Sequence, residues 1–320
     1  MHVQIVPTQE RGRVGAPFSI LEMFQLELAE PLEEVKDRLY EELRTLPLAS
    51  ELAGHWISQM QFWSAATILA FAKRHGEIRP GHIDVAVTIE LLFVVFNFHA
   101  PNAQLQRARD AAIGEHILVG DFYLTRASAN ALKSNRIQTL ASIATIMRCL
   151  PESLLMAMER PEDPVTAYRL YRRRHEIGCD QVILHCLLAS LSESEKELDR
   201  GVLKGLSSAL SRNFRATFEW NSWSQPRIDM LPEWDLPAFI AYGRSSATER
   251  REIADAQASP QPCSNARLNE LFNNTKAIHT CAAYASRCGT RAVSKIYRLM
   301  KQETAFSPTR YSPELLATHA

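Results

Sequence analysis

IELLFVVFNFH, residues 89–99, contains the longest apolar run of the chain, Ile89–Phe98. This run is about half as long as the ~20 residues that a bilayer-spanning helix needs, and Glu90 and Asn97 interrupt it. We therefore expect no transmembrane segment and a soluble protein.

Outward from this run, apolar residues recur every three or four positions, which is the period of amphipathic helices. Near the start they predict two helices, Ile20–Leu28 and Val35–Leu43, divided by Pro31. The dipeptides Asn-Gly and Asp-Gly, which mark β-hairpins, do not separate alternating segments, so we expect an all-α fold. Loops are expected at 219–235 and 258–264. The remaining expected helices cover 60–74, 83–99, 111–130, 135–149, 165–191, 195–218, 236–257 and 265–303.

Composition is that of an ordinary globular protein of 320 residues, with 46% apolar and 22% charged residues. The 36 basic residues balance 36 acidic ones, so the net charge gives no reason to expect nucleic-acid binding. The low count of 12 glycines also favours long helices over many short strands. No linker or repeat divides the chain, and we expect one domain over 1–320 with peripheral tails at 1–18 and 304–320.

The N-terminus, Met1-His2-Val3-Gln4, lacks both the basic start and the apolar core of a secretory signal. We therefore expect a cytoplasmic protein. Its six cysteines form no Cys-x-x-Cys pair, which favours core thiols over disulfides and predicts no zinc site.

Three segments resemble the trans-polyprenyl diphosphate synthases, in that family's order and nearly its spacing. The run at 89–99 is similar to the helix with an Ile-Glu-Leu start and a His just before the first aspartate-rich motif. His116–Ala127, HILVGDFYLTRA, resembles the next helix with its Gly-Asp pair. Gln225–Asp229 with Glu233 and Leu236-Pro237 resembles a loop of the family. Most of the chain is covered.

The resemblance implies a single helical bundle of the isoprenoid synthase type, with a central cavity. It also implies a dimer whose contact lies around the helices at 83–99 and 111–130. The family condenses isopentenyl diphosphate onto an allylic diphosphate, and two aspartate-rich clusters on facing helices hold three Mg²⁺ ions for this reaction.

Both clusters are degenerate in this chain. After His99, where the family has Asp-Asp-x-x-Asp, the positions are filled by Ala100, Pro101, Asn102 and Gln104. At the second cluster, which we place at Phe218, Glu219 and Ser222, one acid remains of three. One carboxylate supplies too few oxygen ligands, so we expect no bound metal or other cofactor, and Mg²⁺ only in a catalytic partner or in active relatives.

The isopentenyl diphosphate element is degenerate too. Its Lys, Arg and Arg fall on His55, Trp56 and Ser58, of which Trp56 and Ser58 cannot supply a phosphate-binding charge.

The resemblance further implies that residues just before the first motif set the depth of the prenyl tunnel. Here these are Phe93, Val95 and Phe96. We expect Phe96 to narrow or close the tunnel.

Other conspicuous residues receive structural interpretations. Without neighbouring carboxylates His99 has no partner ligands, and Asp121 is expected to bond a neighbouring helix. His175 and His185 lie ten apart on one expected helix and so point in different directions, and their placement is interpreted as chance. Arg172–Arg174 are expected to be solvated. The tryptophans Trp220, Trp223 and Trp234 either cover the bundle mouth or contact a partner or apolar ligand.

The leading hypothesis is a catalytically inactive, non-catalytic or regulatory subunit that binds a catalytic prenyl diphosphate synthase subunit or itself. One alternative is a divergent terpenoid enzyme, a cyclase or prenyl transferase, that uses the same cavity. The other is a protein that binds a prenyl or other apolar ligand. The carboxylates available to such an enzyme are Glu90, Glu115, Asp121, Glu152 and Glu219.

Overall fold

The structure is a computed structural model, and it describes residues 16–46, 61–99, 113–133, 136–159, 161, 163–194, 200–224, 234–258 and 265–304. The described residues contain helices and no strand, which confirms the all-α fold. The helices are α1 (Ile20–Glu27), α2 (Ala29–Leu43), α4 (Trp63–Arg74), α5 (Pro80–His99), α7 (Ile113–Lys133), α8 (Ile137–Met158), α9 (Pro164–His175), the π-helical η1 (Glu176–Gln181), α10 (Val182–Ser194), α11 (Arg200–Ser224), α12 (Leu236–Arg244), α13 (Ala247–Ala258), α14 (Asn265–Asn274) and α15 (Ala277–Thr304).

Two helices, α4 and α5, form the centre of the bundle. In α4 every side chain from Ser64 to Ala72 is buried, and from residue 81 to residue 96 of α5 no side chain is exposed. A helix that is apolar on all sides must be surrounded by other helices. The main core accordingly joins α4 and α5 to α1, α2, α7, α8, α10 and α11. No helix in the described ranges has both the length and the apolar character needed to cross a bilayer.

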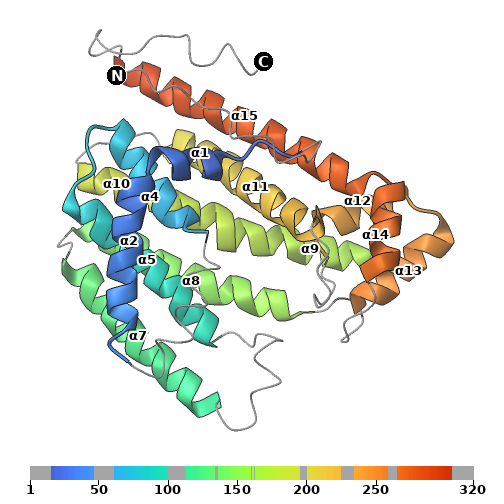
Figure 1. Cartoon of the computed structure of the whole chain (residues 1–320), viewed down its shortest axis with the longest axis horizontal. Coiled ribbons are helices and arrows are strands. Elements are labelled where there is room, and N and C mark those ends of the chain that lie inside the picture. Colours follow the sequence, from blue (N-terminus) through green and yellow to red (C-terminus); the bar gives the residue numbers. More distant parts are fainter. Residues whose placement is uncertain are drawn as a thin grey trace.

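The shorter helices α12, α13 and α14 form a separate group at one end of the molecule (Figure 1). They enclose a small core of their own, which includes Ile253, Leu271 and Phe272. The long α15 runs beside α11 along one edge of the bundle in the same view and connects this group with the main core. The C-terminal half of α11 therefore lies between two cores.

The first turn of α4 receives its cap from another helix. Phe62 precedes the helix in a left-handed conformation (φ 50°) and has no side-chain acceptor for the free N–H groups. Glu90 of α5 takes this role, because its Oε1 accepts hydrogen bonds from the Ala65 N–H at 2.9 Å and from the Ser64 hydroxyl.

The structure corrects the expected effect of two prolines. The first two helices are divided at Leu28, and Pro31 lies in the first turn of α2, where a missing N–H costs no hydrogen bond. The helix expected to end at 149 continues to Met158 with Pro151 inside it.

The expected single helix at 165–191 is also wrong, because six residues of η1 have π-helical geometry between α9 and α10. The neighbouring α8 lies so close that a Cβ at Gly178 would be 2.1 Å from Ser153 Oγ. The loop expected at 219–235 begins later, since α11 continues to Ser224.

Candidate functional site

The three positions of the second cluster lie on α11 and have different environments. Glu219 is 6% exposed, whereas the side chain of Phe218 is 50% exposed. Ser222 is half-buried, and its hydroxyl donates to the Phe218 carbonyl at 3.1 Å. Only Glu219 therefore offers a carboxylate, and it faces the interior.

Both oxygens of Glu219 already accept hydrogen bonds. The Tyr171 hydroxyl on α9 donates to Oε1 and Oε2 at 3.1 and 3.0 Å. The Leu236 N–H, at the start of α12, donates to Oε2 at 3.0 Å. Glu219 thus fastens three helices, α9, α11 and α12, at one point.

Two basic side chains face the same carboxylate at longer range. Arg215 Nε lies 3.9 Å and His175 Nε2 lies 3.7 Å from Glu219 Oε1. Both nitrogens are buried, and neither has a hydrogen-bond partner among the residues that the structure describes. The Arg215 guanidinium also stacks over the Tyr171 ring at 4.9 Å.

Burial dominates the electrostatics of this cluster. Burial raises the pKa of Glu219, while the Arg215 charge acts in the opposite direction. Burial, together with Arg215, strongly lowers the pKa of His175, so its imidazole is neutral. Burial and the Glu219 charge raise the pKa of Tyr171, which keeps the hydroxyl as a donor. The charge of Glu219 is therefore balanced mainly by Arg215, with a smaller contribution from Arg174.

Cys179 Sγ lies 3.6 Å from His175 Nδ1, an arrangement similar to a cysteine activated by a neighbouring histidine base. Burial raises the pKa of this thiol to about 11. A reactive cysteine needs a depressed thiol pKa. The pair is therefore interpreted as part of the packing between η1 and α9.

These residues do not fit a magnesium cluster. Mg²⁺ requires several oxygen ligands in octahedral geometry, and at the positions of the second cluster one carboxylate is present whose oxygens are already engaged. Across the described residues, no three His, Cys, Asp or Glu side chains are grouped to hold a metal ion. The first cluster at Ala100, Pro101 and Gln104 lies outside the described residues, as do His55, Trp56 and Ser58.

On α5, the residues expected to line a tunnel lie in or against the main core. Val95 is fully buried and Phe96 is 9% exposed. Phe93 is half-buried, with its ring in edge contact with Trp63 at a centroid distance of 5.0 Å. This end of α5 is thus densely packed with apolar side chains.

The carboxylates considered for another chemistry do not form one constellation among the described side chains. Glu90 and Glu219 have separate partners on separate helices. Asp121 is exposed on α7 and Glu152 is half-buried on α8, whereas the side chain of Glu115 lies outside the described ones. The expected hydrogen bond of Asp121 to a neighbouring helix stays a prediction.

Sequence reasoning missed His175, Tyr171 and Arg215 as neighbours of Glu219. The interpretation of His175 as a chance placement is corrected, because its ring packs edge-on against Tyr171 at a centroid distance of 4.4 Å. Arg172 and Arg173 are exposed as expected, but Arg174 is half-buried, and its charge acts on His175 and Glu219. A carboxylate on one helix and a Tyr-x-x-x-His pair on another carry no sequence signal of contact.

The tryptophans are part of the packing. Trp220 is buried against α15. The ring of Trp223 contacts that of Phe272 at a centroid distance of 4.5 Å, and its indole N–H donates to the Asp235 carboxylate. Trp234 stacks on Phe239 at 4.9 Å. These contacts join the end of α11 to α12 and α14.

Comparison with solved structures identifies the fold. The chain superposes on a decaprenyl diphosphate synthase from Rhodobacter capsulatus with a TM-score of 0.67 and 15% identity, covering 91% of this chain and 99% of that one. A geranylgeranyl pyrophosphate synthase from Bacteroides thetaiotaomicron gives a TM-score of 0.68 at 14% identity, covering 87% and 92%. A polyprenyl synthase from Caulobacter crescentus CB15, crystallised with calcium and isoprenyl diphosphate, gives a TM-score of 0.67 at 15% identity. The match covers 88% of this chain and 92% of that one. No protein-family model and no curated protein sequence matches the chain. The chain therefore has the all-α isoprenoid synthase fold.

Proposed function

We propose that this protein is a catalytically inactive relative of the polyprenyl diphosphate synthases and acts as the non-catalytic subunit of a heteromeric prenyl diphosphate synthase. The fold supports the family. The state of Glu219 supports the loss of catalysis, and it is the observation on which the proposal depends. In this proposal the protein works in the cytoplasm and binds a catalytic subunit or a second copy of itself.

The argument from Glu219 is electrostatic. A catalytic cluster must present carboxylates to metal ions that neutralise a leaving diphosphate. Here the remaining carboxylate is directed at the Tyr171 hydroxyl and the Leu236 N–H, with the Arg215 guanidinium 3.9 Å away. A fixed cation beside the carboxylate disfavours a divalent metal at the same place. The half-exposed Phe218 stands where the family has an aspartate.

A partner surface is available on α7. Leu118, Phe122, Thr125, Ala129 and Leu132 are exposed and follow one another at spacings of four and three residues. This is the spacing of a helix seam that packs against another helix. Leu118 and Leu132 are 70% and 67% exposed, and Ile137 at the start of α8 extends the apolar surface. We propose this surface, named the α7 seam, as the subunit contact.

The burial of α5 supports a smaller contact region than the one expected from the resemblance. The helix expected at 83–99 was assigned to the interface together with 111–130, but residues 81–96 of α5 have no exposed side chain. That part of α5 offers a partner only a few half-buried side chains, among them Asp84 and Phe93. The subunit contact is therefore proposed for α7 and the start of α8.

Activity of the isolated chain tests the loss of catalysis. Incubated with isopentenyl and farnesyl diphosphates and Mg²⁺, the protein should form no longer prenyl diphosphate, because metal and phosphate groups are both altered. Thermal unfolding should likewise not shift when Mg²⁺ and inorganic diphosphate are added. Chelator-sensitive product formation by the isolated protein would overturn the proposal.

The subunit role is tested by co-purification with a prenyl diphosphate synthase encoded by the same organism. An obligate contact would bury over ~2,000 Å² and produce a stable complex or a homodimer on gel filtration. The double variant Leu118→Glu/Leu132→Glu should abolish that assembly. Leu155→Glu, a matched change at an exposed leucine of α8, should leave it intact. A strict monomer that captures no synthase would argue against the subunit role.

A protein that binds an apolar ligand is the second candidate, and the exposure of Phe218 favours it. A large apolar side chain that stays half-exposed beside a buried polar cluster is suited to contact an isoprenoid chain. Saturable binding of farnesol by the monomer, weakened by Phe218→Ser, would support this function in place of the subunit role.

A further inference from the structure

The surface formed by α11 and α15 carries charge of one sign. α15 contains no acid from Ala277 to Gln302, and the one acid of α11, Glu219, is buried. Basic side chains on the outer sides of the two helices are exposed, except for the half-buried Lys295. We call this set the basic face, and it consists of Lys204 and Arg212 on α11 and of Arg287, Arg291, Lys295 and Arg298 on α15.

The basic residues of α15 lie on one side of the helix. Arg287, Arg291 and Lys295 follow one another at steps of four, and Arg298 comes three residues later. At about 3.6 residues per turn, all of them fall within a sector of about 80° around the helix axis. They therefore form a stripe along α15.

The basic residues of α11 adjoin this stripe. Lys295 Nζ lies beside Gly205 of α11, where a Cβ would be 2.8 Å from it, and Lys204 is the preceding residue. Nearer the other end of α11, Arg212 faces Tyr284 of α15. Burial raises the pKa of Tyr284, and the Arg212 charge acts in the opposite direction. The basic face is thus continuous across both helices.

The charges of the basic face are not compensated. None of its side chains has an ion pair or a hydrogen bond within the part of the chain that the structure describes. Asp180 of η1 lies against α11, but it accepts a hydrogen bond from the buried Ser211 hydroxyl. Like charges at a spacing of four residues destabilise a helix. The stripe therefore lowers stability until anions from outside neutralise it.

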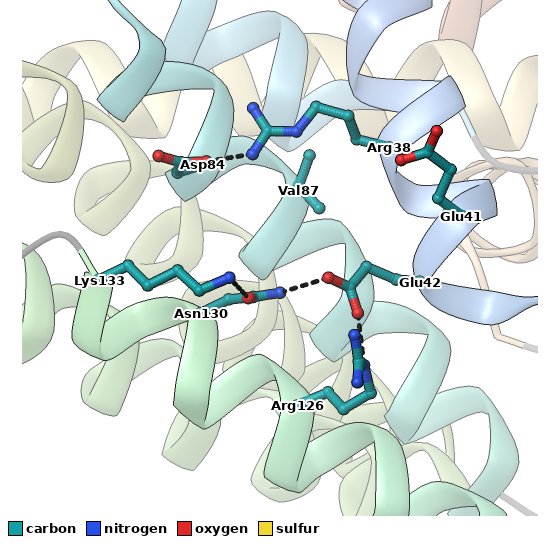
Figure 2. Close-up of a pocket in the computed structure, with 8 residues that line it drawn as sticks. All are labelled: Arg38, Glu41, Glu42, Asp84, Val87, Arg126, Asn130 and Lys133. Carbon is teal, nitrogen blue, oxygen red and sulfur yellow. Dashed lines mark hydrogen bonds and ion pairs between the residues drawn. The ribbon is translucent and has the colours of Figure 1, made fainter. Parts of the chain in front are cut away.

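The charged hollow between α2, α5 and α7 shows the opposite arrangement (Figure 2). There Arg38 forms an ion pair with Asp84. Arg126 and Asn130 donate hydrogen bonds to Glu42. Basic and acidic side chains neutralise one another in this hollow, whereas the basic face has no such partners among the described residues. The balanced net charge of the whole chain conceals this local excess.

An exposed aromatic ring borders the basic face. The Phe18 N–H donates to Ser286 Oγ of α15 at 3.0 Å. Its ring lies over Gly289, where a Cβ would be 2.7 Å from the ring Cδ1. Phe18 is nevertheless 40% exposed. Basic side chains next to an exposed apolar ring are typical of surfaces that bind the headgroup region of a membrane.

We propose that the basic face binds the surface of a membrane that contains anionic lipids. In Figure 1, α15 forms the outer edge of the bundle with α11 beside it, so the charges are spread over a broad surface that can meet a flat array of phosphates. The arginines pair with lipid phosphates, and Phe18 enters the headgroup region. The α7 seam lies on the opposite side of the bundle in this view, so an assembled subunit keeps the basic face accessible.

Sedimentation of the full chain with lipid vesicles tests this proposal. Phosphatidylcholine vesicles with about 30% phosphatidylserine should bind the protein, and phosphatidylcholine alone should not. Phosphatidylglycerol at the same charge should replace phosphatidylserine without loss. Raising the salt concentration from about 0.1 M to about 0.5 M should release the protein.

Charge removal on the basic face gives the decisive comparison. The triple variant Arg287→Gln/Arg291→Gln/Arg298→Gln should weaken binding at least about thirtyfold, because each basic residue near an anionic surface contributes about fivefold. Phe18→Ser should weaken binding about fivefold and leave its salt dependence unchanged, because the ring carries no charge.

A second triple variant, Arg44→Gln/Arg172→Gln/Arg251→Gln, is the matched control. It removes three exposed arginines from the end of α2, from α9 and from α13, and it changes the net charge equally. This variant should bind like the wild type. Circular dichroism and thermal unfolding verify that both triple variants remain folded, which we expect for surface changes.

Equal losses in the two triple variants would show that net charge, and not the basic face, determines binding, and would overturn the proposal. Absence of binding to the anionic vesicles, or equal binding to phosphatidylcholine alone, would overturn it too. Binding of single-stranded RNA without binding to the anionic vesicles would replace the lipid surface with a nucleic acid. These results do not depend on whether the protein is catalytically inactive.

Discussion

Two buried glutamates, Glu90 on α5 and Glu219 on α11, perform the same local task in different surroundings. Glu90 accepts the Ala65 N–H at the start of α4, and Glu219 accepts the Leu236 N–H at the start of α12. Around Glu90 the helices are apolar, and burial raises its pKa to about 7. Around Glu219 stand Tyr171, His175 and Arg215. The same acid is thus a helix cap with a strongly raised pKa in one region and the partner of a buried cation in the other.

Phe96→Ala measures how densely the Glu90 region is packed. We expect a loss of about 3–5 kcal/mol in the free energy of unfolding, because a 9% exposed phenyl ring leaves a cavity in the main core. Urea unfolding gives this value. The matched change Phe218→Ala, in the Glu219 region, should cost less than about 1 kcal/mol since Phe218 is half-exposed. A small loss for Phe96→Ala would instead indicate an open channel beside this residue.

Glu219→Gln should destabilise the protein by about 3 kcal/mol. The amide keeps hydrogen-bonding capacity but removes the negative charge, which leaves the buried Arg215 guanidinium without a counter-charge. Chemical unfolding at neutral pH measures the loss. The double variant with Arg215→Met should recover part of it, because the unpaired cation is removed as well. Equal losses in the single and double variants would show that the two groups are not coupled.

At alkaline pH, Glu90→Gln should raise the free energy of unfolding, whereas Glu219→Gln lowers it. The pKa of Glu90 is about 7 in the folded chain against an ordinary value of 4.5 for glutamate, so between these values the native state holds a proton that the unfolded chain has lost. Stability therefore falls as the pH rises through this window. Glutamine mimics the protonated acid, and we expect the variant to be about 2 kcal/mol more stable than the wild type at pH 8. Unfolding curves from pH 4 to pH 8 should lose this slope in the variant, and an unchanged slope would contradict the assignment.

Tyr171→Phe should have the smallest effect of the four, about 1 kcal/mol. It removes the hydroxyl that donates to both oxygens of Glu219 but keeps the ring under Arg215. Thermal unfolding at neutral pH measures this loss. Tyr168→Phe is the matched control, because its ring stacks on Tyr171 but its hydroxyl has no partner within the described residues. A loss as large as that of Glu219→Gln would mean that the hydroxyl, not Arg215, stabilises the carboxylate.

Helical periodicity predicts the all-α fold well, and the resemblance to prenyl synthase motifs is enough to single out Glu219. The break at Leu28 was missed because Pro31 carries the stronger local signal, although a proline is harmless in a first turn. The neighbours of Glu219 were missed for a different reason. Tyr171 and Arg215 meet only because α9 and α11 pack together, and no spacing along the chain encodes that contact.

The π-helical η1 has a consequence for insertions and deletions. A π-turn holds one residue more than an α-turn, and each added residue rotates the preceding helix by about 100° relative to the following one. This rotation lets α9 direct Tyr171 and His175 at α11 while α10 keeps its own apolar side in the main core. Deleting a single residue between 176 and 181 would restore a regular helix and turn both side chains away from Glu219. The length of this segment, more than the identity of its residues, is therefore what the polar cluster requires.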